Sequence, residues 1–202
     1  MAELNIIRGS LLAPSQPPLG YVTGKFYLAC APLMHTLSGN QATADRIFYI
    51  PPFQIVEDVT FTAAKMYVTG TAAGSARISI YTYSTNARIS QLGNIDLSAT
   101  GWRSLSISLS LTRGQAVFLG VNYSSTPTVA RVLQQAGATD SAYNERLTTE
   151  LGKPSFIGDP TDSNIWGTRA GKTTFTYDGS TTPDPAAPSA EDGHIPAVFL
   201  VK

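Results

Sequence analysis

The chain has 202 residues, of which 43% are hydrophobic and only 14% are charged, and its formal net charge is zero. Globular domains usually carry about 25% charged residues, and here serine, threonine and glycine supply the polarity instead, a composition that favours an assembly or an extracellular setting. Neutrality leaves no basic field for nucleic acid or anionic lipid, and no apolar run approaches the roughly 18 residues that span a bilayer. We therefore expect neither a nucleic-acid nor a membrane partner. The single cysteine, Cys30, excludes an intrachain disulfide, and we expect it to be a small buried side chain.

Residues 1–20 predict an extended N-terminal arm, because Pro14, Pro17 and Pro18 prevent a continuous helix. The sequence leaves open whether this arm docks on a neighbouring subunit or forms an edge strand on its own domain. The first residues lack the charged start and long apolar run of a signal peptide, so we expect synthesis in a cytoplasm without standard export. The candidate assembly residues of the arm are its apolar side chains, namely Leu4, Ile6, Ile7, Leu11 and Leu12.

Residues 21–202 are expected to form a single domain. Tyr21–Ala31, Arg46–Ile50 and Asp58–Thr69 predict strands, whereas Leu37–Ala44 is polar and predicts a loop. The apolar positions of Asp58–Thr69 change parity part of the way along. That change predicts a β-bulge near Ala64 and Lys65.

Trp102–Leu111 is the clearest strand in the chain, because apolar and serine residues alternate with a period of two. We expect it to be the central strand of a sandwich, flanked by Ser75–Tyr83 and Gln115–Ser125. Thr112–Gly114 would be its hairpin connection, and Trp102 would lie at the edge of the core. The inward residues would be Leu105, Ile107, Leu109 and Leu111, and the outward residues Ser104, Ser106, Ser108 and Ser110.

The remaining strand signals are shorter. Leu92–Leu97 predicts a strand with Ile95 and Leu97 inward, and Thr126–Gln134 predicts another. Residues 135–194 are irregular, apart from a strand predicted over Thr173–Tyr177 and a weak helical pattern over Ala142–Leu151. Ile195–Lys202 is an apolar terminal strand that its own sheet or a neighbour must cover. The pattern as a whole predicts an all-β, antiparallel β-sandwich with an extended arm and an irregular C-terminal region.

The sequence contains no recognisable catalytic or metal-binding motif. Neither His35 nor His194 has metal-ligand spacing, and no nucleophile elbow or phosphate-binding loop is present. Asp159, Asp162 and Asp178 fit solvated turns better than a calcium site, since the EF-hand pattern is missing. We expect no catalytic residue, no metal and no cofactor.

Four aromatic residues are candidate ligand or interface residues. Tyr81 and Tyr83 lie on the strand face opposite the predicted core, whereas Tyr143 and Trp166 lie in the irregular region. Such rings could stack on sugars, fill a subunit interface, where Tyr and Trp are enriched, or pack beneath a long loop. The sequence leaves these three alternatives open.

Three segments carry a resemblance to a known group of proteins: Arg77-Ile-Ser-Ile-Tyr-Thr-Tyr, Leu92-Gly-Asn-Ile-Asp-Leu-Ser, and the stretch from Gly101-Trp102 to Gly120-Val121. Together with the closing Ile195-Pro-Ala-Val-Phe-Leu-Val, they resemble the jelly-roll-like β-sandwich domains of tailed-bacteriophage structural proteins. Those include tail-fibre, head-fibre and capsid-decoration proteins, whose domains are similar to carbohydrate-binding modules. The chain lacks the collagen-like or coiled-coil repeats of many long fibres, which favours a compact knob or surface protein over a fibre shaft.

The resemblance implies a non-enzymatic structural protein of the virion that assembles with other capsid or tail proteins. It also implies a homo-oligomer, most often a trimer, made in the host cytoplasm and released by lysis within the particle. The alternative is a receptor- or carbohydrate-binding module on the virion surface, with a host surface glycan as partner. A tail-spike hydrolase would need paired carboxylates on a concave face, and no predicted strand carries such a pair.

Overall fold

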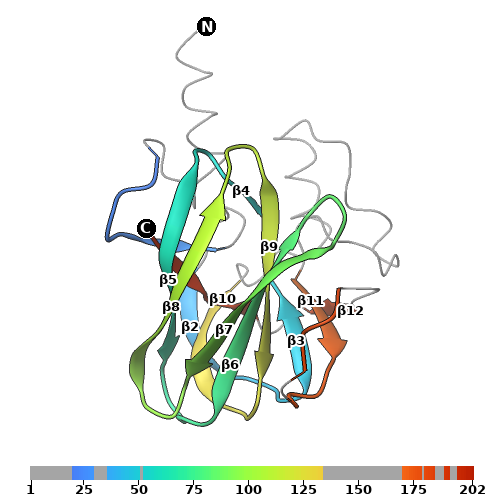
Figure 1. Cartoon of the computed structure of the whole chain (residues 1–202). Helices are drawn as coiled ribbons and strands as arrows, with labels where there is room; N and C mark the ends of the chain where they lie inside the picture. The colour runs from blue at the N-terminus through green and yellow to red at the C-terminus, as the bar shows by residue number, and fades with distance from the viewer. Residues whose placement is uncertain are drawn as a thin grey trace, which may run out of the picture.

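The computed structural model describes residues 20–29, 36–50, 52–133, 170–178, 180–184, 189–191 and 195–202. All regular structure in these residues is β, and every strand pair is antiparallel. The strands form two seven-stranded sheets (Figure 1). The predicted all-β antiparallel fold is confirmed. Within the described part of the chain, no helix has the length and hydropathy needed to cross a membrane.

The first sheet, sheet A, is built around β5 (Val59–Val68). β8 (Gly101–Leu111) pairs with β5 along its whole length, so the shorter pairings to β14 (Phe199–Val201) and β10 (Thr128–Leu133) occupy the opposite edge of β5. β14 is thereby covered by its own sheet, as the apolar C-terminal sequence requires. The other strands of sheet A are β1 (Phe26–Leu28) beside β14, with β2 (Thr36–Gln41) and β13 (Ile195–Pro196) beside β10.

The second sheet, sheet B, has the order β12-β11-β3-β9-β6-β7, and a short β4 also pairs with β9. Its centre is the pair β9 and β6, and β7 returns beside β6 as a hairpin. The strands of sheet B are β3 (Arg46–Tyr49), β4 (Phe53–Gln54), β6 (Ser75–Thr82), β7 (Arg88–Asp96), β9 (Ala116–Tyr123), β11 (Ala170–Thr174) and β12 (Ser189–Glu191).

The main core lies between the two sheets. Phe61 and Met66 of sheet A share one buried cluster with Ile78 and Val121 of sheet B, and each is at most 1% exposed. Burying an apolar side chain of this size contributes about 1.5–3 kcal/mol relative to exposure. The inward side chains predicted for β6, β7 and β9 therefore hold the two sheets together.

The bulge predicted in β5 is present, but it lies two or three residues earlier than expected. The pairing of β5 with β8 shifts register between Phe61 and Ala63, and the inward residues change from Val59 and Phe61 to Ala64 and Met66. The sequence hides this position because Ala63 is small and apolar, and so fits either parity.

The predicted position of Trp102–Leu111 at the centre of a three-stranded unit is wrong. β8 pairs with β5 in sheet A, whereas Ser75–Tyr83 and Gln115–Ser125 contribute β6 and β9 to sheet B. Thr112–Gly114 accordingly carries the chain from one sheet to the other and is not a hairpin. Alternation identified the inward residues of β8, but it carries no information about which strand lies beside it.

Two further predictions need correction. Leu37–Ala44 is not a loop, because Thr36–Gln41 forms β2 and pairs with β10 through backbone hydrogen bonds that polar residues can also make. The strand expected over Thr173–Tyr177 is observed as Ala170–Thr174, paired with β3. The helical pattern over 142–151 lies outside the described residues.

The two ends of the described chain meet at one carboxylate. The backbone N–H of Tyr21 donates to Glu57 Oε1 at 2.7 Å, and Lys202 Nζ reaches the same oxygen at 3.3 Å. Lys202 Nζ also donates to the carbonyl oxygen of Tyr21 at 2.7 Å. These bonds, the one from Tyr21 foremost, hold the pKa of the Glu57 carboxyl below its usual value. Tyr21, near the start of the described residues, and Lys202, the last residue, are thus joined through Glu57.

Candidate functional site

A cluster of four aromatic residues lies on the outer face of sheet A, and we call it the aromatic platform. Trp102 of β8 is its centre and is directly opposite Tyr67 of β5, with ring centroids 5.2 Å apart. Phe26 of β1 and Phe199 of β14 approach the same indole at 5.4 and 5.3 Å. All three neighbours meet it at interplanar angles of 68–78°, the edge-to-face arrangement that aromatic quadrupoles favour.

The platform is open to solvent. Trp102 is 49% exposed, Phe26 42% and Tyr67 38%, whereas Phe199 is half-buried. The ammonium group of Lys65 lies 4.3 Å from the centroid of the Phe26 ring, a cation–π contact that adds a positive charge at the margin. Large aromatic side chains clustered on a surface are a recognised signature of a binding site.

A band of hydroxyl groups continues from the platform, and we call it the hydroxyl track. It consists of exposed serines of β8 and exposed threonines of β5, two strands that pair along their whole length. At its far end Thr60 Oγ1 and Ser110 Oγ lie 2.9 Å apart, and Thr62 Oγ1 donates to the carbonyl oxygen of Val201 at 3.3 Å. The members are Ser104, Ser106, Ser108, Ser110, Thr60 and Thr62.

The outer face of sheet B carries a second group of aromatic residues, and this one is buried. Tyr81 of β6 and Phe118 of β9 stack with centroids 5.1 Å apart, and Tyr49 of β3 packs edge-on against both. These rings and Ile47 form a separate apolar cluster, against which Tyr83 and Phe175 pack. Burial raises the pKa of the Tyr81 phenol above its usual value.

The described residues that follow β11, 175–178 and 180–184, cross this face, and we call them the C-terminal strap. Arg77, only 2% exposed, donates from Nη1 to the carbonyl oxygen of Ser180 at 2.6 Å, and its guanidinium lies 4.3 Å from the centroid of the Tyr177 ring. The hydroxyls of Ser79 and Thr182 are 2.5 Å apart. β6 therefore holds the strap through polar contacts that flank the buried rings.

β7 and β9 hold the strap at further points. The backbone N–H of Arg88 donates to Asp184 Oδ1 at 2.6 Å, and its guanidinium donates to the carbonyl oxygen of Thr182. On β9, Asn122 Nδ2 donates to the carbonyl oxygens of Arg46 and Phe175 at 2.9 and 3.1 Å. Three neighbouring strands thus fix one irregular segment in place.

Gly120 of β9 makes close packing under the strap possible. A Cβ atom there would lie 2.9 Å from Tyr81 Cε2 and 3.1 Å from Ile47 Cγ2. This glycine therefore marks a close approach of side chains from β6 and β3.

Of the four aromatic candidates from the sequence, the structure describes Tyr81 and Tyr83. Tyr81 faces away from the main core as predicted, but it is 0% exposed, which fits the loop-packing alternative and leaves no ring face for a ligand. Tyr83 is half-buried beside it. Tyr143 and Trp166 lie outside the described residues, as do Leu4, Ile6, Ile7, Leu11 and Leu12 of the predicted arm.

The expectation that Trp102 lies at the edge of the core is wrong, since half of this side chain is exposed. The sequence did contain the signal, because Trp102 has the same parity as Ser104, Ser106, Ser108 and Ser110 and so belongs to the polar face of β8. Its position at the start of the strand makes this outward parity easy to overlook.

Among the remaining candidate residues, the structure describes only Asp178. The carboxylate of Asp178 accepts the backbone N–H of Ser180 at 2.8 Å. The bond from the Ser180 hydroxyl, and after it this backbone bond, lowers the pKa of the carboxyl. Asp178 is therefore a turn aspartate, as expected. Cys30, His35, His194, Asp159 and Asp162 lie outside the described residues. Within the described ranges, no three His, Cys, Asp or Glu side chains are grouped to hold a metal ion.

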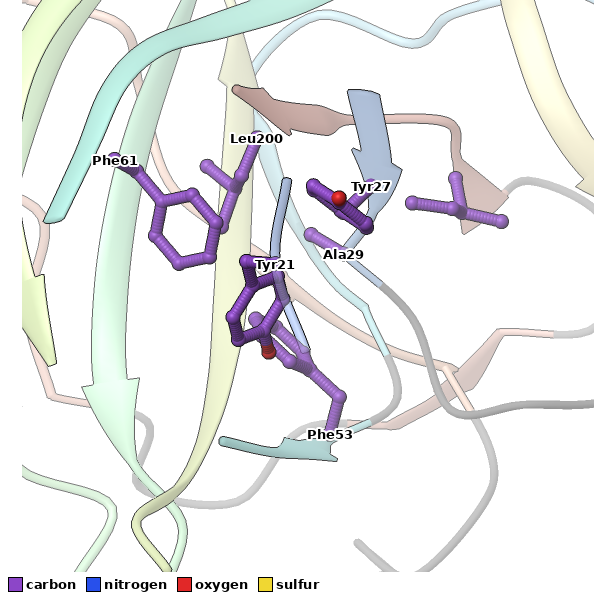
Figure 2. A pocket seen from close by; sticks show the side chains of 7 residues that line it. Tyr21, Tyr27, Ala29, Phe53, Phe61 and Leu200 are labelled. Carbon is purple, nitrogen blue, oxygen red and sulfur yellow. The ribbon is translucent and has the colours of Figure 1, made fainter. Parts of the chain in front are cut away.

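One small cavity lies between β1, β14 and the main core. Figure 2 shows Tyr21, Tyr27 and Phe61 directed toward it, with Ala29, Phe53 and Leu200 around them. Its volume is about 10 Å³, which is near the minimum for one water molecule. The cavity is a packing space, and the aromatic platform with its hydroxyl track remains the strongest candidate site. Comparison with protein-family models, curated proteins and solved structures finds no match to this chain.

Proposed function

We propose that the chain is a structural component of a tailed-bacteriophage virion, of the capsid-decoration, head-fibre or tail-associated kind. It acts through protein–protein assembly and catalyses no reaction. Its partners are other capsid or tail proteins and further copies of itself, most simply in a trimer. The N-terminal arm, through Leu4, Ile6, Ile7, Leu11 and Leu12, provides the apolar contacts for assembly.

The observation that carries the proposal is where the phage-like segments fall in the fold. Arg77–Tyr83 supplies most of β6, Leu92–Ser98 the end of β7, Gly101–Val121 all of β8 and most of β9, and Ile195–Val201 supplies β13 and β14. The segments that prompted the resemblance are thus strands of one antiparallel sandwich. A resemblance spread over loops would support the proposal far less.

The proposal is tested on purified particles. Mass spectrometry should detect the chain in stoichiometric amount in virions, and a variant lacking residues 1–18 should fold but fail to be incorporated. Particles of normal composition that lack the chain would refute the virion role. Unchanged incorporation of the truncated variant would refute the role of the arm only.

A second candidate function is favoured by the exposure of Phe26, Tyr67 and Trp102. A virion protein with an uncovered aromatic platform is suited to binding a receptor on the host surface. The purified protein should then adsorb to host cells and compete with intact particles for them. Failure to do either would count against the receptor role without affecting the structural one.

A further inference from the structure

The aromatic platform is organised in advance of binding. Trp102 packs against three aromatic rings, with ring centroids 5.2–5.4 Å apart, yet it remains half exposed. An aromatic ring has only two side-chain torsions, and here its neighbours restrict them further. A ligand that packs on the indole would therefore lose little affinity to the ordering of the protein.

The hydroxyl track gives the site a direction. At about 3.4 Å per residue, the distance along β8 from Trp102 to Ser110 is about 27 Å, and alternate positions along it carry a hydroxyl. Each serine or threonine hydroxyl can both donate and accept a hydrogen bond. An elongated ligand with many hydroxyl groups could be bound along this line, anchored at the aromatic end.

The face is almost uncharged. On the outward positions of β5 and β8, both of which are described in full, Lys65 is the one ionisable side chain apart from the Tyr67 phenol. Its ammonium is already engaged with the Phe26 ring. A polyanionic ligand would have a single cation to pair with on these strands. A neutral ligand carries no charge, so it would not pay the cost of removing a charged group from water.

A protein partner fits this surface less well than a carbohydrate. Protein interfaces are enriched in aromatic residues but depleted in serine, and the track contains four serines next to the platform. A sugar ring offers an apolar C–H face, which packs on an aromatic face, and hydroxyl groups around its rim. The aromatic platform matches the apolar face of a sugar ring, and the hydroxyl track matches its hydroxyl groups.

We propose that the outer face of sheet A binds a neutral, linear polysaccharide, with one sugar ring on Trp102 and the chain running along the hydroxyl track. The proposal rests on the receptor-binding form of the proposed function and identifies its ligand class and residues. Tyr67 and Phe26 lie beside the sugar ring that packs on Trp102. Serines 104 to 110 bind the hydroxyls of the following sugars.

The test is affinity electrophoresis of the purified full chain in native gels that contain a neutral glucan, a neutral mannan or a neutral galactan. Polygalacturonate, which is linear and anionic, serves as the charged comparison. The variants are Trp102→Ala, Tyr67→Ser and Ser106→Val, and the matched control is Ile89→Ala, which trims an exposed apolar side chain of sheet B. Far-UV circular dichroism confirms that each variant is folded.

We expect at least one neutral polysaccharide to retard the protein and Trp102→Ala to weaken binding about tenfold, as for a central aromatic anchor. Tyr67→Ser and Ser106→Val should weaken binding about threefold or more, and Ile89→Ala should leave it unchanged. If Trp102→Ala does not fold, the other two variants still decide the question.

Several results would overturn the proposal. These are no retardation by any neutral polysaccharide, equal retardation by polygalacturonate, or binding unaffected by the platform and track variants. Self-association that Trp102→Ala abolishes would overturn it too, since the face would then be a contact between copies. None of these results would remove the chain from virions, so particle composition tests the structural function separately.

Discussion

The outer faces of sheet A and sheet B both carry aromatic residues, but those of sheet A are exposed and those of sheet B are buried. Tyr81 on sheet B and Trp102 on sheet A are both aromatic residues on the outward parity of a strand, yet Tyr81 is 0% exposed and Trp102 is 49% exposed. The difference is the C-terminal strap, which crosses sheet B and has no counterpart over the platform in the described residues. An outward strand position therefore becomes core or surface according to what a distant segment does.

The strap is held mainly by polar contacts, although it covers an apolar cluster. Arg77, Ser79 and Arg88 bind backbone or hydroxyl groups of Ser180 and Thr182, which are about a hundred residues away along the chain. Hydrogen bonds to charged groups are worth about 1.5–3 kcal/mol each in such settings. The closed face thus depends on a few side chains.

The largest effect is expected from truncating the buried ring. Tyr81→Ala should lower the free energy of unfolding by about 3–5 kcal/mol, because it empties the space beneath the strap. Trp102→Ala, its matched change on the open face, should cost about 1 kcal/mol, since only ring-to-ring contacts are lost. Urea denaturation of both variants measures the difference. Equal losses would mean that the two faces are buried alike.

The next effect concerns the main anchor of the strap. Arg77→Ala should cost about 2–3 kcal/mol, because it removes a buried charged donor and leaves the carbonyl oxygen of Ser180 without that bond. Hydrogen exchange should rise in residues 175–184 and stay unchanged in β8. Arg103→Ala is the control, since its ion pair with Asp96 is exposed and worth at most about 1 kcal/mol. A strap that stays protected in Arg77→Ala would show that Arg77 is not its main anchor and that the contacts from Ser79, Arg88 and Asn122 suffice.

A smaller effect is expected from overfilling the closed face. Gly120→Ala should cost about 1–3 kcal/mol, because the added methyl group meets Tyr81 and Ile47 at contact distances that require both to move. Ser106→Ala on the open face should change stability by no more than about 0.5 kcal/mol. Thermal unfolding of the pair measures this, and a neutral Gly120→Ala would indicate that the cluster has room to relax.

The smallest effect is expected at Glu57, where Tyr21 and Lys202 meet. Because folding lowers the pKa of Glu57, its ionised form stabilises the folded state above the unfolded pKa of about 4.3, and this contribution is lost as pH falls through the folded pKa. Glu57→Gln should therefore lower the melting temperature slightly at pH 7 and progressively less below pH 4.3. A difference that stays constant into acid would rule out the charge as its cause.

The sequence predicted much of the fold because alternation in a strand is a local property. The inward positions of β6, β7, β8 and β9 follow from it, and so does the exposed serine row. The same rule, applied to Trp102, would have placed this ring on the open face and indicated the platform's centre. Phe199 and Phe26 could not be added to it, because only the pairing of β14 with β5 and of β1 with β14 brings them there.

The order of residues thus determines which side chain of each strand points inward, and the neutral, hydroxyl-rich character of the outer face of β8. Packing between distant segments decides that β8 pairs with β5, and that Tyr81 lies beneath the C-terminal strap while Trp102 stays exposed. The difference arises from the range of the interactions. Alternation arises between neighbours along one strand, whereas strand pairing and the cover over a face depend on contacts between segments far apart, whose ordering entropy and burial are set by the whole chain.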